Sequence, residues 1–234
     1  MTNSSPDFLF PPAPQPSVAV KGLASRFPVK RIFCVARNYA AHAVEMGSAP
    51  EKTAPVYFTK SPHALVASGA KIPYPPGTSD FHYEMELVVA LGKDGFDIPR
   101  AQAVEYIYGY ACGLDMTRRD LQAAFREKGH PWDTAKDFEN AAVISEIVPA
   151  NPGSSFLAAG AITLSVNGET RQSADLADML NDIGEIISDL SRFYRLCAGD
   201  LIYTGTPAGV GSVTSGDLME GAIAGVGEIT LEIA

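Results

Sequence analysis

The sequence predicts an α+β fold with mixed or mostly antiparallel sheets and a few helices. Short apolar or alternating segments follow one another along most of the 234 residues, and such segments are typical of strands. Helical patterns are few and do not alternate regularly with the strands, so a parallel sheet built from repeated βαβ units is not favoured. The pair Asn167-Gly168 between two such segments marks a tight hairpin.

Most individual strands are predicted from apolar or alternating runs bounded by glycine, proline or other turn residues. The strand at 169–172 is predicted as the partner of 161–166 across the Asn167-Gly168 turn. Each run is four to ten residues long, which is the ordinary length of a strand. The predicted strands are 31–36, 56–60, 82–91, 106–114, 161–166, 169–172, 200–204 and 228–233.

Three helices are predicted from end signals and helical spacing. A short helix is expected between Asn38 as N-cap and Gly47 as C-terminal stop. A second is expected after Thr117, with Asp120 three residues on as in a capping box. The one long helix spans about 182–194, because apolar residues recur there at helical spacing. These residues are Ile183, Ile186, Ile187, Leu190 and Phe193.

Composition limits the organisation and the partners of the chain. Residues 1–29 are expected to form a proline-rich arm and lead-in, and residues 30–234 a single domain. The net charge of −9 disfavours nucleic acid and anionic membranes as partners. No apolar run reaches the length of a membrane span, and no secretory signal is evident. Three widely spaced cysteines indicate reduced packing residues and a cytoplasmic location.

The segment His82–Leu91 carries the first candidate site. In a strand, Glu84 and Glu86 lie on the same face, roughly 7 Å apart, and that face continues into the small apolar residues Val88 and Ala90. Two desolvated carboxylates repel each other unless a cation or a proton lies between them. The pattern alone leaves two alternatives: a metal site, or an acidic pair in water at a sheet edge.

Other chemistry-bearing residues are weak signals when each is taken alone. His42 and Glu45 are three residues apart on the predicted short helix, where the carboxylate can fix one imidazole tautomer for a general base. A solvated helix face is the alternative. Asp115 ends a predicted strand, and Lys136 lies in a predicted loop. The loop 205–211 lacks a nucleotide-binding pattern and is interpreted as a tight turn or as amides facing a carboxylate.

Together, five ordered motifs over roughly residues 30–234 resemble the fumarylacetoacetate hydrolase family. Residues 27–32 and the proline-rich arm look most like its fumarylpyruvate hydrolases. Departures are Ala36, where glycine is common, and residues 139–142, which replace the usual stretch near Lys136. The five motifs are Arg37–Gly47 with His42 and Glu45, then Tyr83–Leu87, Gly113–Gln122, Ala135–Phe138 and Tyr203–Gly211.

The resemblance implies mixed sheets rolled into a β-sandwich or incomplete barrel with flanking helices. It also implies that Glu84, Glu86 and Asp115 bind one divalent ion, Mg²⁺ or Mn²⁺. An all-oxygen ligand set suits such hard cations and argues against zinc. The short helix at 38–47 is expected to act as a lid over the substrate.

The reaction implied by the resemblance is hydrolysis of the C3–C4 bond of an acylpyruvate, a 2,4-dioxo acid. The expected substrate is 3-fumarylpyruvate, giving fumarate and pyruvate in gentisate catabolism. His42, oriented by Glu45, would activate the water, and Lys136 with the metal would stabilise the pyruvate enolate. Family members are commonly dimers, so a homodimer is expected.

The remaining site residues are assigned to substrate binding by the same resemblance. Arg119, Gln122 and the loop residues Gly205 and Thr206 are expected to hold the 2-oxo acid end. Lys60 is expected to reach the far carboxylate. Alternatives on the same metal site are decarboxylation of oxaloacetate or a related 2-oxo acid and isomerisation of a 2-hydroxydienoate. The outside alternative is a non-catalytic metal-binding protein.

Overall fold

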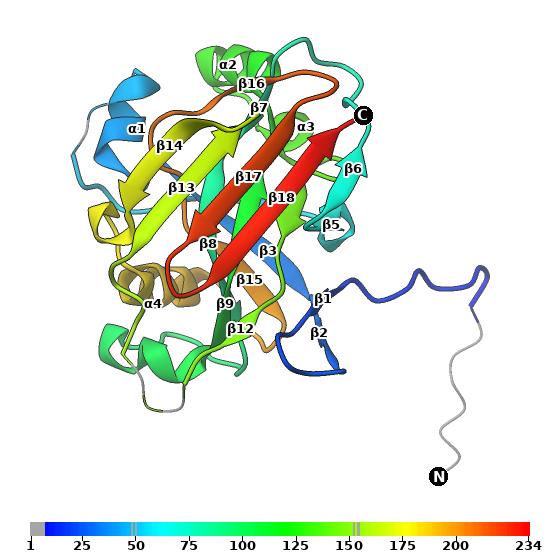
Figure 1. The fold of residues 1–234 in the computed structure, drawn as a ribbon. Coiled ribbons are helices and arrows are strands. Elements are labelled where there is room, and N and C mark those ends of the chain that lie inside the picture. The colour runs from blue at the N-terminus through cyan, green and yellow to red at the C-terminus, as the bar shows by residue number, and fades with distance from the viewer. Residues whose placement is uncertain (1–7, 48, 50, 152, 154) are drawn as a thin grey trace.

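An eight-stranded mixed sheet runs through the centre of the molecule (Figure 1). The structure is a computed structural model that describes residues 8–47, 49, 51–151, 153 and 155–234. In order across the sheet the strands are β4 (Val56–Lys60), β3 (Arg31–Ala36), β15 (Asp200–Tyr203), β8 (Met85–Leu91), β9 (Ile107–Asp115), β11 (Ala142–Ile144) and β5 (Leu65–Ala67), and β12 (Val148–Pro149) pairs with β9.

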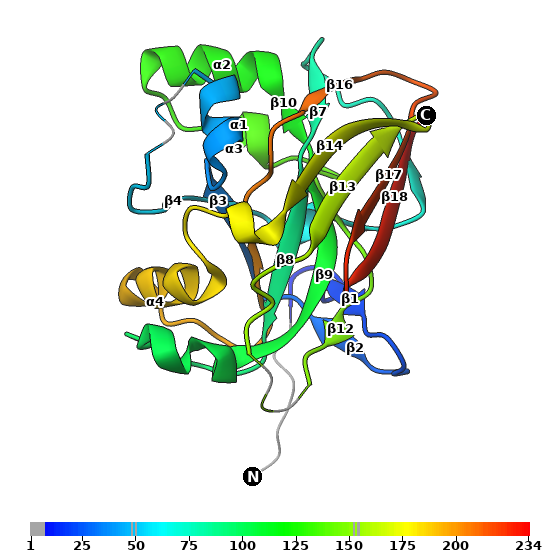
Figure 2. The ribbon, with the colours of Figure 1, turned by 60° about the vertical axis from the view of Figure 1, so that its left-hand side comes forward.

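A five-stranded sheet packs on the central sheet, and β13 and β18 contact β8 and β9. Figure 2, in which β17 and β18 are seen nearly edge-on, shows the two sheets lying against each other. Gly221 permits this close approach, because a Cβ atom there would lie 2.7 Å from the sulfur of Met85. The strands in order are β14 (Glu169–Asp175), β13 (Ala161–Val166), β17 (Leu218–Ile223), β18 (Gly227–Ile233) and β6 (Ala70–Ile72).

The predicted fold class is confirmed, and most strand bounds agree with the sequence analysis. The predicted hairpin turn at Asn167-Gly168 joins β13 to β14. The two sheets, curled around a continuous apolar core, give the half-barrel form that the family resemblance implies. No helix in the described part of the chain combines the length and hydropathy needed to cross a membrane.

The predicted single strand over residues 82–91 is wrong, because the chain changes sheets at Glu84. Residues before it form β7 (Phe81–Tyr83), the middle strand of a small sheet with β10 (Thr117–Arg118) and β16 (Gly211–Val213). Residues after it form β8 of the central sheet. The Met85 N–H donates to Gln172 Oε1 (3.0 Å) and not to a neighbouring strand, so the ladder is interrupted there.

The helices are few and mostly short, as predicted. Figures 1 and 2 show α1, α2 and α3 near one end of the sheets and α4 near the other. The long predicted helix is confirmed: α4 starts after Asp182, which forms a capping box with Glu185. Phe193 is 63% exposed and lies outside the buried stripe. The helices are α1 (Ala40–Glu45), α2 (Arg119–Lys128), α3 (Asp133–Lys136) and α4 (Ile183–Phe193), with 3₁₀ segments at Pro62–Ala64, Arg100–Tyr106 and Leu176–Asp178.

The predicted capping box at the start of α2 is wrong. Thr117 lies in β10, and the N-cap position is Arg118, which makes no side-chain cap. The Asp120 carboxylate instead accepts hydrogen bonds from the Thr78 hydroxyl (2.6 Å) and the Ser79 N–H (3.0 Å). The Thr117 hydroxyl faces the buried charges of the site and not the helix end.

Asn38 is likewise not the cap of α1, whose N-cap position is Tyr39. Its fully buried amide joins three segments of the chain. Nδ2 donates to the carbonyl oxygens of Asn181 (3.0 Å) and Thr204 (2.8 Å), and Oδ1 accepts from the Asn181 N–H (2.8 Å). Asn38 therefore fastens the entry to α1 onto the loop that follows β15.

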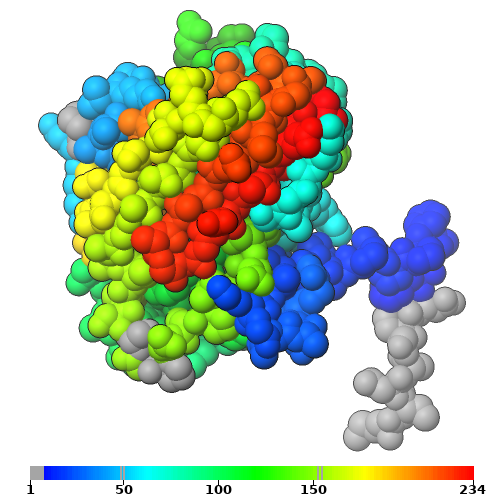
Figure 3. Space-filling model, in the orientation of Figure 1, coloured from blue at the N-terminus to red at the C-terminus, as the bar shows by residue number. Residues whose placement is uncertain are grey.

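Within the N-terminal arm, residues 8–14 are exposed and stand away from the rest of the protein (Figure 3). Phe8 and Phe10 are 57% and 75% exposed, so they do not attach the arm to the surface. A small hairpin of β1 (Ser17–Ala19) and β2 (Arg26–Pro28) follows. The domain boundary near residue 30 stays a prediction.

We expect Asn38→Ala to destabilise the protein by about 3 kcal/mol, because it leaves buried backbone groups of Asn181 and Thr204 without partners. Denaturant unfolding measures the difference. The matched control is Asn151→Ala, since Asn151 is exposed. Equal stabilities of the two variants would contradict the anchoring role of Asn38.

Candidate active site

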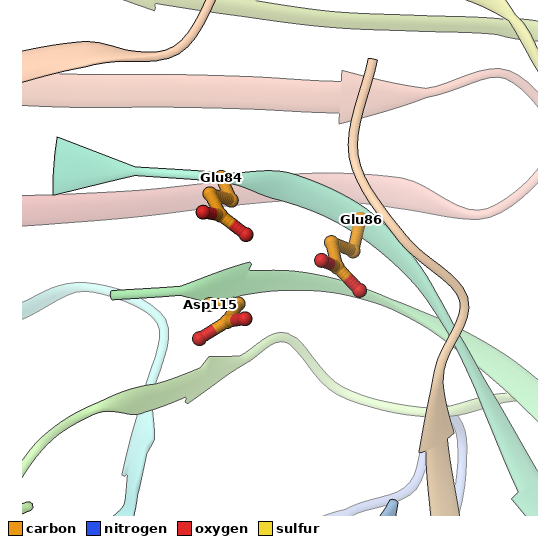
Figure 4. Close-up of side chains that lie close together, drawn as sticks. All are labelled: Glu84, Glu86 and Asp115. Atoms are coloured by element: carbon orange, nitrogen blue, oxygen red, sulfur yellow. The ribbon is translucent and has the colours of Figure 1, made fainter. Parts of the chain in front are cut away.

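Three buried carboxylates converge at one end of the central sheet. Glu84 lies at the junction between β7 and β8, Glu86 lies on β8, and Asp115 ends β9. Glu86 pairs with Gly113 in the β8–β9 ladder, and the Asp115 N–H donates to the Glu84 carbonyl (2.9 Å). One oxygen from each carboxylate lies within 4.8 Å of the others (Figure 4), and none of the three residues is more than 5% exposed.

Buried cations surround two of these carboxylates. The Lys136 ammonium lies 2.9 Å from Glu84 Oε2 and 2.7 Å from Asp115 Oδ2. The Arg119 guanidinium lies 2.5 Å from Glu84 Oε1. Among the described residues Glu86 has no cationic partner, and its Oε2 accepts from the Gly205 N–H (2.8 Å). The set therefore holds one buried carboxylate that is not paired with a cation.

This imbalance moves the pKa values of the two glutamates in opposite directions. Burial, followed by the neighbouring charges of Asp115 and Glu84, raises the pKa of Glu86 well above its usual value. Burial also opposes ionisation of Glu84, but attraction to Lys136 and Arg119 outweighs it and holds the pKa of Glu84 below its usual range. Glu86 is thus the carboxylate that most needs a cation or a proton.

The residues fit a hard divalent cation. All three donors are carboxylates, which Mg²⁺ and Mn²⁺ prefer. Asp115 Oδ1 accepts no hydrogen bond within the described part of the chain, although Lys60 Nζ lies 2.7 Å away. A fully buried oxygen without a hydrogen bond is open to another electrophilic partner. Glu84, Glu86 and Asp115 could together hold one such ion.

A histidine on α1, His42, lines the same cavity and is paired with Glu45. His42 is 5% exposed, and its Nδ1 lies 3.0 Å from Glu45 Oε2. The other Glu45 oxygen accepts from the Gly209 N–H (3.0 Å). The carboxylate thereby places the proton on Nδ1 and leaves Nε2 able to accept one. The geometry suits a general base held between α1 and the glycine-rich loop.

The cavity that joins these groups has a volume of about 450 Å³. Arg119 and Gln122 reach it from α2 and hydrogen-bond to each other, and Thr206 reaches it from the glycine-rich loop. The buried Thr206 hydroxyl accepts from Gln172 Nε2 (2.8 Å). Polar groups therefore line one wall of a space large enough for a small organic acid.

Lys60 does not occupy the position expected for it. It does not line the cavity, and its ammonium is buried against Asp115 and the carbonyl oxygens of Met116 and Lys136. A buried carboxylate needs compensating charge, and this explains the position of Lys60 under the site. Contact with the far carboxylate of a substrate does not fit this geometry.

The glycine-rich loop presents backbone amides to carboxylates of the protein itself. The Gly205 N–H is used by Glu86 and the Gly209 N–H by Glu45. Gly205 adopts φ +96°, and a Cβ there would lie 2.7 Å from Cβ of Asn38. The interpretation of this loop as amides facing a carboxylate is confirmed, and the amide of Gly205 is occupied by Glu86.

Sequence reasoning missed three residues that shape the site. Gln172, on β14, is fully buried and bonds Met85, Thr206 and the carbonyl of Pro207. No local pattern marks it, because it comes from a distant hairpin. Arg37 and Arg126 line the cavity. Arg126 could have been found from its spacing of seven residues from Arg119, which places both on one helix face.

Comparison with known proteins agrees with this geometry. The family model described as the fumarylacetoacetate (FAA) hydrolase C-terminal matches residues 31–234. The chain belongs to the fumarylacetoacetate hydrolase family. Among its members, a fumarylpyruvate hydrolase from a Ralstonia species is 56% identical over 177 residues, which cover 76% of this chain and 91% of the relative.

Two further members of the fumarylacetoacetate hydrolase family extend the comparison. The crystal structure of fumarylpyruvate hydrolase from Pseudomonas aeruginosa in complex with Mn²⁺ and pyruvate is 47% identical, with a TM-score of 0.93 over 97% of this chain and 99% of that one. The mitochondrial oxaloacetate tautomerase of Homo sapiens is 41% identical over 206 residues, 87% of this chain and 91% of that protein.

We expect Mn²⁺ binding to the metal-free protein to release protons and to weaken as the pH falls. Only ionised Glu86 binds the ion, and its raised pKa means that ionisation is lost as the pH falls through a value above the ordinary carboxyl range. Calorimetric titration in buffers of different ionisation enthalpy measures both effects. Glu86→Gln should weaken binding about tenfold or more and release fewer protons.

The control for this experiment is Glu220→Gln, which changes an exposed glutamate on β17. It should bind Mn²⁺ as the unmodified protein does. An Mn²⁺ affinity that stays constant between about pH 5 and pH 8 is the result that contradicts the role of Glu86.

Proposed function

We propose that this chain is a divalent-metal-dependent acylpyruvate hydrolase that converts 3-fumarylpyruvate and water to fumarate and pyruvate. The observation that carries the proposal is one cavity lined by His42, Glu84, Glu86 and Lys136. Asp115 completes the carboxylate triad beside Lys136, and Glu45 contacts His42 Nδ1. The names of the Ralstonia and Pseudomonas relatives support the reaction. The Mn²⁺ and pyruvate in the Pseudomonas structure support the metal and one product.

The first step assigned to the protein is activation of water by His42. Glu45 accepts a hydrogen bond from the Nδ1–H of His42, which leaves Nε2 free to act as the base. Nε2 takes a proton from a water molecule while the hydroxyl of that water adds to C4 of the substrate. The imidazolium that forms lies 3.0 Å from the Glu45 carboxylate. Glu45 therefore stabilises the charge that appears on His42 during the attack.

The second step is cleavage of the C3–C4 bond. The electron pair passes to C3 and the 2-oxo group, giving the enolate of pyruvate, and C3 then takes a proton from His42. Burial alone would lower the pKa of Lys136, but the negative charges of Asp115 and Glu84 outweigh burial and leave the pKa above its usual value. The ammonium therefore stays charged beside the enolate. A divalent ion held by Glu84, Glu86 and Asp115 supplies further electrophilic stabilisation.

Arg119 and Gln122 are proposed to hold the carboxylate next to the 2-oxo group, with Thr206 on the same wall. Arg119 is buried, which makes its charge effective toward an anion in the cavity. The lid role of α1 is also a proposal. Helix α1 has six residues, and so short a helix depends on contacts with other parts of the protein.

Oxaloacetate tautomerisation is the second candidate, favoured by the similarity to the human tautomerase. Decarboxylation of oxaloacetate and isomerisation of a 2-hydroxydienoate remain further alternatives on this site. The His42–Glu45 pair favours hydrolysis over decarboxylation, because decarboxylation requires no activated water. The choice between Mg²⁺ and Mn²⁺, the homodimer, the cytoplasmic location and the gentisate pathway stay predictions.

We expect absorbance assays to show turnover of fumarylpyruvate that stops on chelation and returns with Mn²⁺ or Mg²⁺. The reason is that the substrate's 2-oxo acid end needs the cation at the triad. Maleylpyruvate, acetylpyruvate and oxaloacetate are tested in parallel. Turnover unaffected by a chelator would falsify the metal mechanism, and activity confined to oxaloacetate would favour the second candidate.

His42→Ala should lower kcat for fumarylpyruvate by about 10²- to 10⁴-fold, the usual effect of losing a general base. Its Mn²⁺ affinity should stay close to that of the unmodified protein. His63→Ala is the matched control, since His63 is exposed and lies outside the cavity. If hydrolysis survives in His42→Ala, another group activates the water.

A further inference from the structure

The exposed side of the cavity, called its mouth below, carries positive charge that the proposed reaction does not use. Arg37, Arg126 and Glu127 line it, and all three are exposed. Two guanidinium groups and one carboxylate leave this mouth with one net positive charge. The mouth is therefore suited to an anionic group on whatever occupies the cavity.

Helix α2 connects the mouth to the inner end. Arg119, Gln122, Ala123 and Arg126 all line the cavity, at spacings of three, four and seven residues that belong to one helix face. Arg119 is buried beside Glu84, whereas Arg126 is exposed. Seven residues of helix advance about 10 Å. Two arginines thus stand at opposite ends of one wall.

Arg126 also reaches across the cavity to α1. Its Nη1 donates to the carbonyl oxygen of Met46 (2.6 Å), the C-cap residue of that helix. Since α1 carries His42, this contact ties the mouth to the element that bears the proposed base. The guanidinium is thereby held at the entrance between the two helices.

Arg37 comes directly after β3 and also lines the cavity. Its backbone adopts φ 57°, in the left-handed region that a residue with a side chain seldom occupies. The neighbouring Asn38 is fastened by its buried amide, which maintains this conformation. Backbone strain of this kind is held where it aims a side chain at a functional site.

Part of the cavity wall is apolar. Phe58 and Trp132 line it, with ring centroids 6.2 Å apart, and Val35 and Ala123 lie on the same cavity. Such a wall suits a carbon chain but offers no partner for an anion. The cavity therefore combines exposed arginines, apolar side chains and the buried carboxylates of Glu84 and Glu86.

We propose that Arg37 and Arg126 bind a second carboxylate at the far end of the substrate, so that the cavity selects 2-oxo acids with a terminal carboxylate. The proposal rests on the proposed function for the place of the first carboxylate, near Arg119. An extended seven-carbon diacid has six C–C bonds, and its end carbons are about 7.5 Å apart. This length is shorter than the advance of about 10 Å along α2 between Arg119 and Arg126. Arginine side chains are flexible enough to bridge the difference.

The test uses two seven-carbon probes that cannot be cleaved, because they lack the 4-oxo group. They are 2-oxoheptanedioate, which has a carboxylate at each end, and 2-oxoheptanoate, which lacks the second one. Dissociation constants are measured by calorimetry on the Mn²⁺-loaded protein. The unmodified protein should bind the dioate about tenfold or more tightly, as expected for a charge-assisted hydrogen bond.

The double variant Arg37→Gln/Arg126→Gln should bind both probes with the same affinity, close to that of the unmodified protein for 2-oxoheptanoate. The matched control is Lys93→Gln/Lys128→Gln, which removes two exposed positive charges outside the cavity. This control should keep the preference for the dioate. The comparison separates direct contact from a general change in net charge.

Three results would overturn the inference: no preference for the dioate in the unmodified protein, an arginine double variant that binds both probes as the unmodified protein does, or a double variant that binds both probes more weakly by the same factor and so keeps the preference. The third would show that the arginines act by holding α1 through Met46. A protein that prefers the dioate but never cleaves fumarylpyruvate would instead overturn the proposed function and leave the carboxylate site supported.

Discussion

The structure around the site depends on the need to neutralise three carboxylates whose oxygens lie within 4.8 Å of one another and are almost fully buried. Charges removed from water are tolerated only when they are paired and hydrogen-bonded. Lys136 forms ion pairs with both Glu84 and Asp115, and Lys60 lies 2.7 Å from Asp115. The Gly205 N–H donates a hydrogen bond to Glu86. The positions of a strand, a short helix and a loop are thus coupled to the same cluster of charges.

This coupling explains the irregular features of the fold at that point. The chain leaves one sheet and enters another at Glu84, so the carboxylate stands at the junction and faces Arg119 at the start of α2. The Gln172 side chain accepts a hydrogen bond from the Met85 N–H, which has no strand partner there, and donates one to the Thr206 hydroxyl. A regular strand through residue 84 would keep the ladder but would displace the carboxylate from its partners.

Local sequence patterns predicted the elements whose bounds depend on neighbouring residues in the chain. The bounds of β3, β4 and α4 follow from apolar periodicity and from the capping box at Asp182. The pair Glu84 and Glu86 was visible as a Glu-x-Glu pattern, but only family resemblance joined Asp115 to it. The break at Glu84, the contact of Thr117 with Lys136 and the buried position of Lys60 could not be predicted, because each is set by charges brought together from distant segments.

The same charge balance links the metal to the substrate. Glu84, Glu86 and Asp115 carry three formal negative charges when ionised, and Lys60, Lys136 and Arg119 carry three positive ones. A divalent ion therefore adds two uncompensated positive charges to an almost fully buried cluster. An anion in the cavity relieves that excess. The ion in turn offsets the burial and the repulsion by Asp115 and Glu84 that together raise the pKa of Glu86. Because coupling between two ligands is reciprocal, each favours binding of the other.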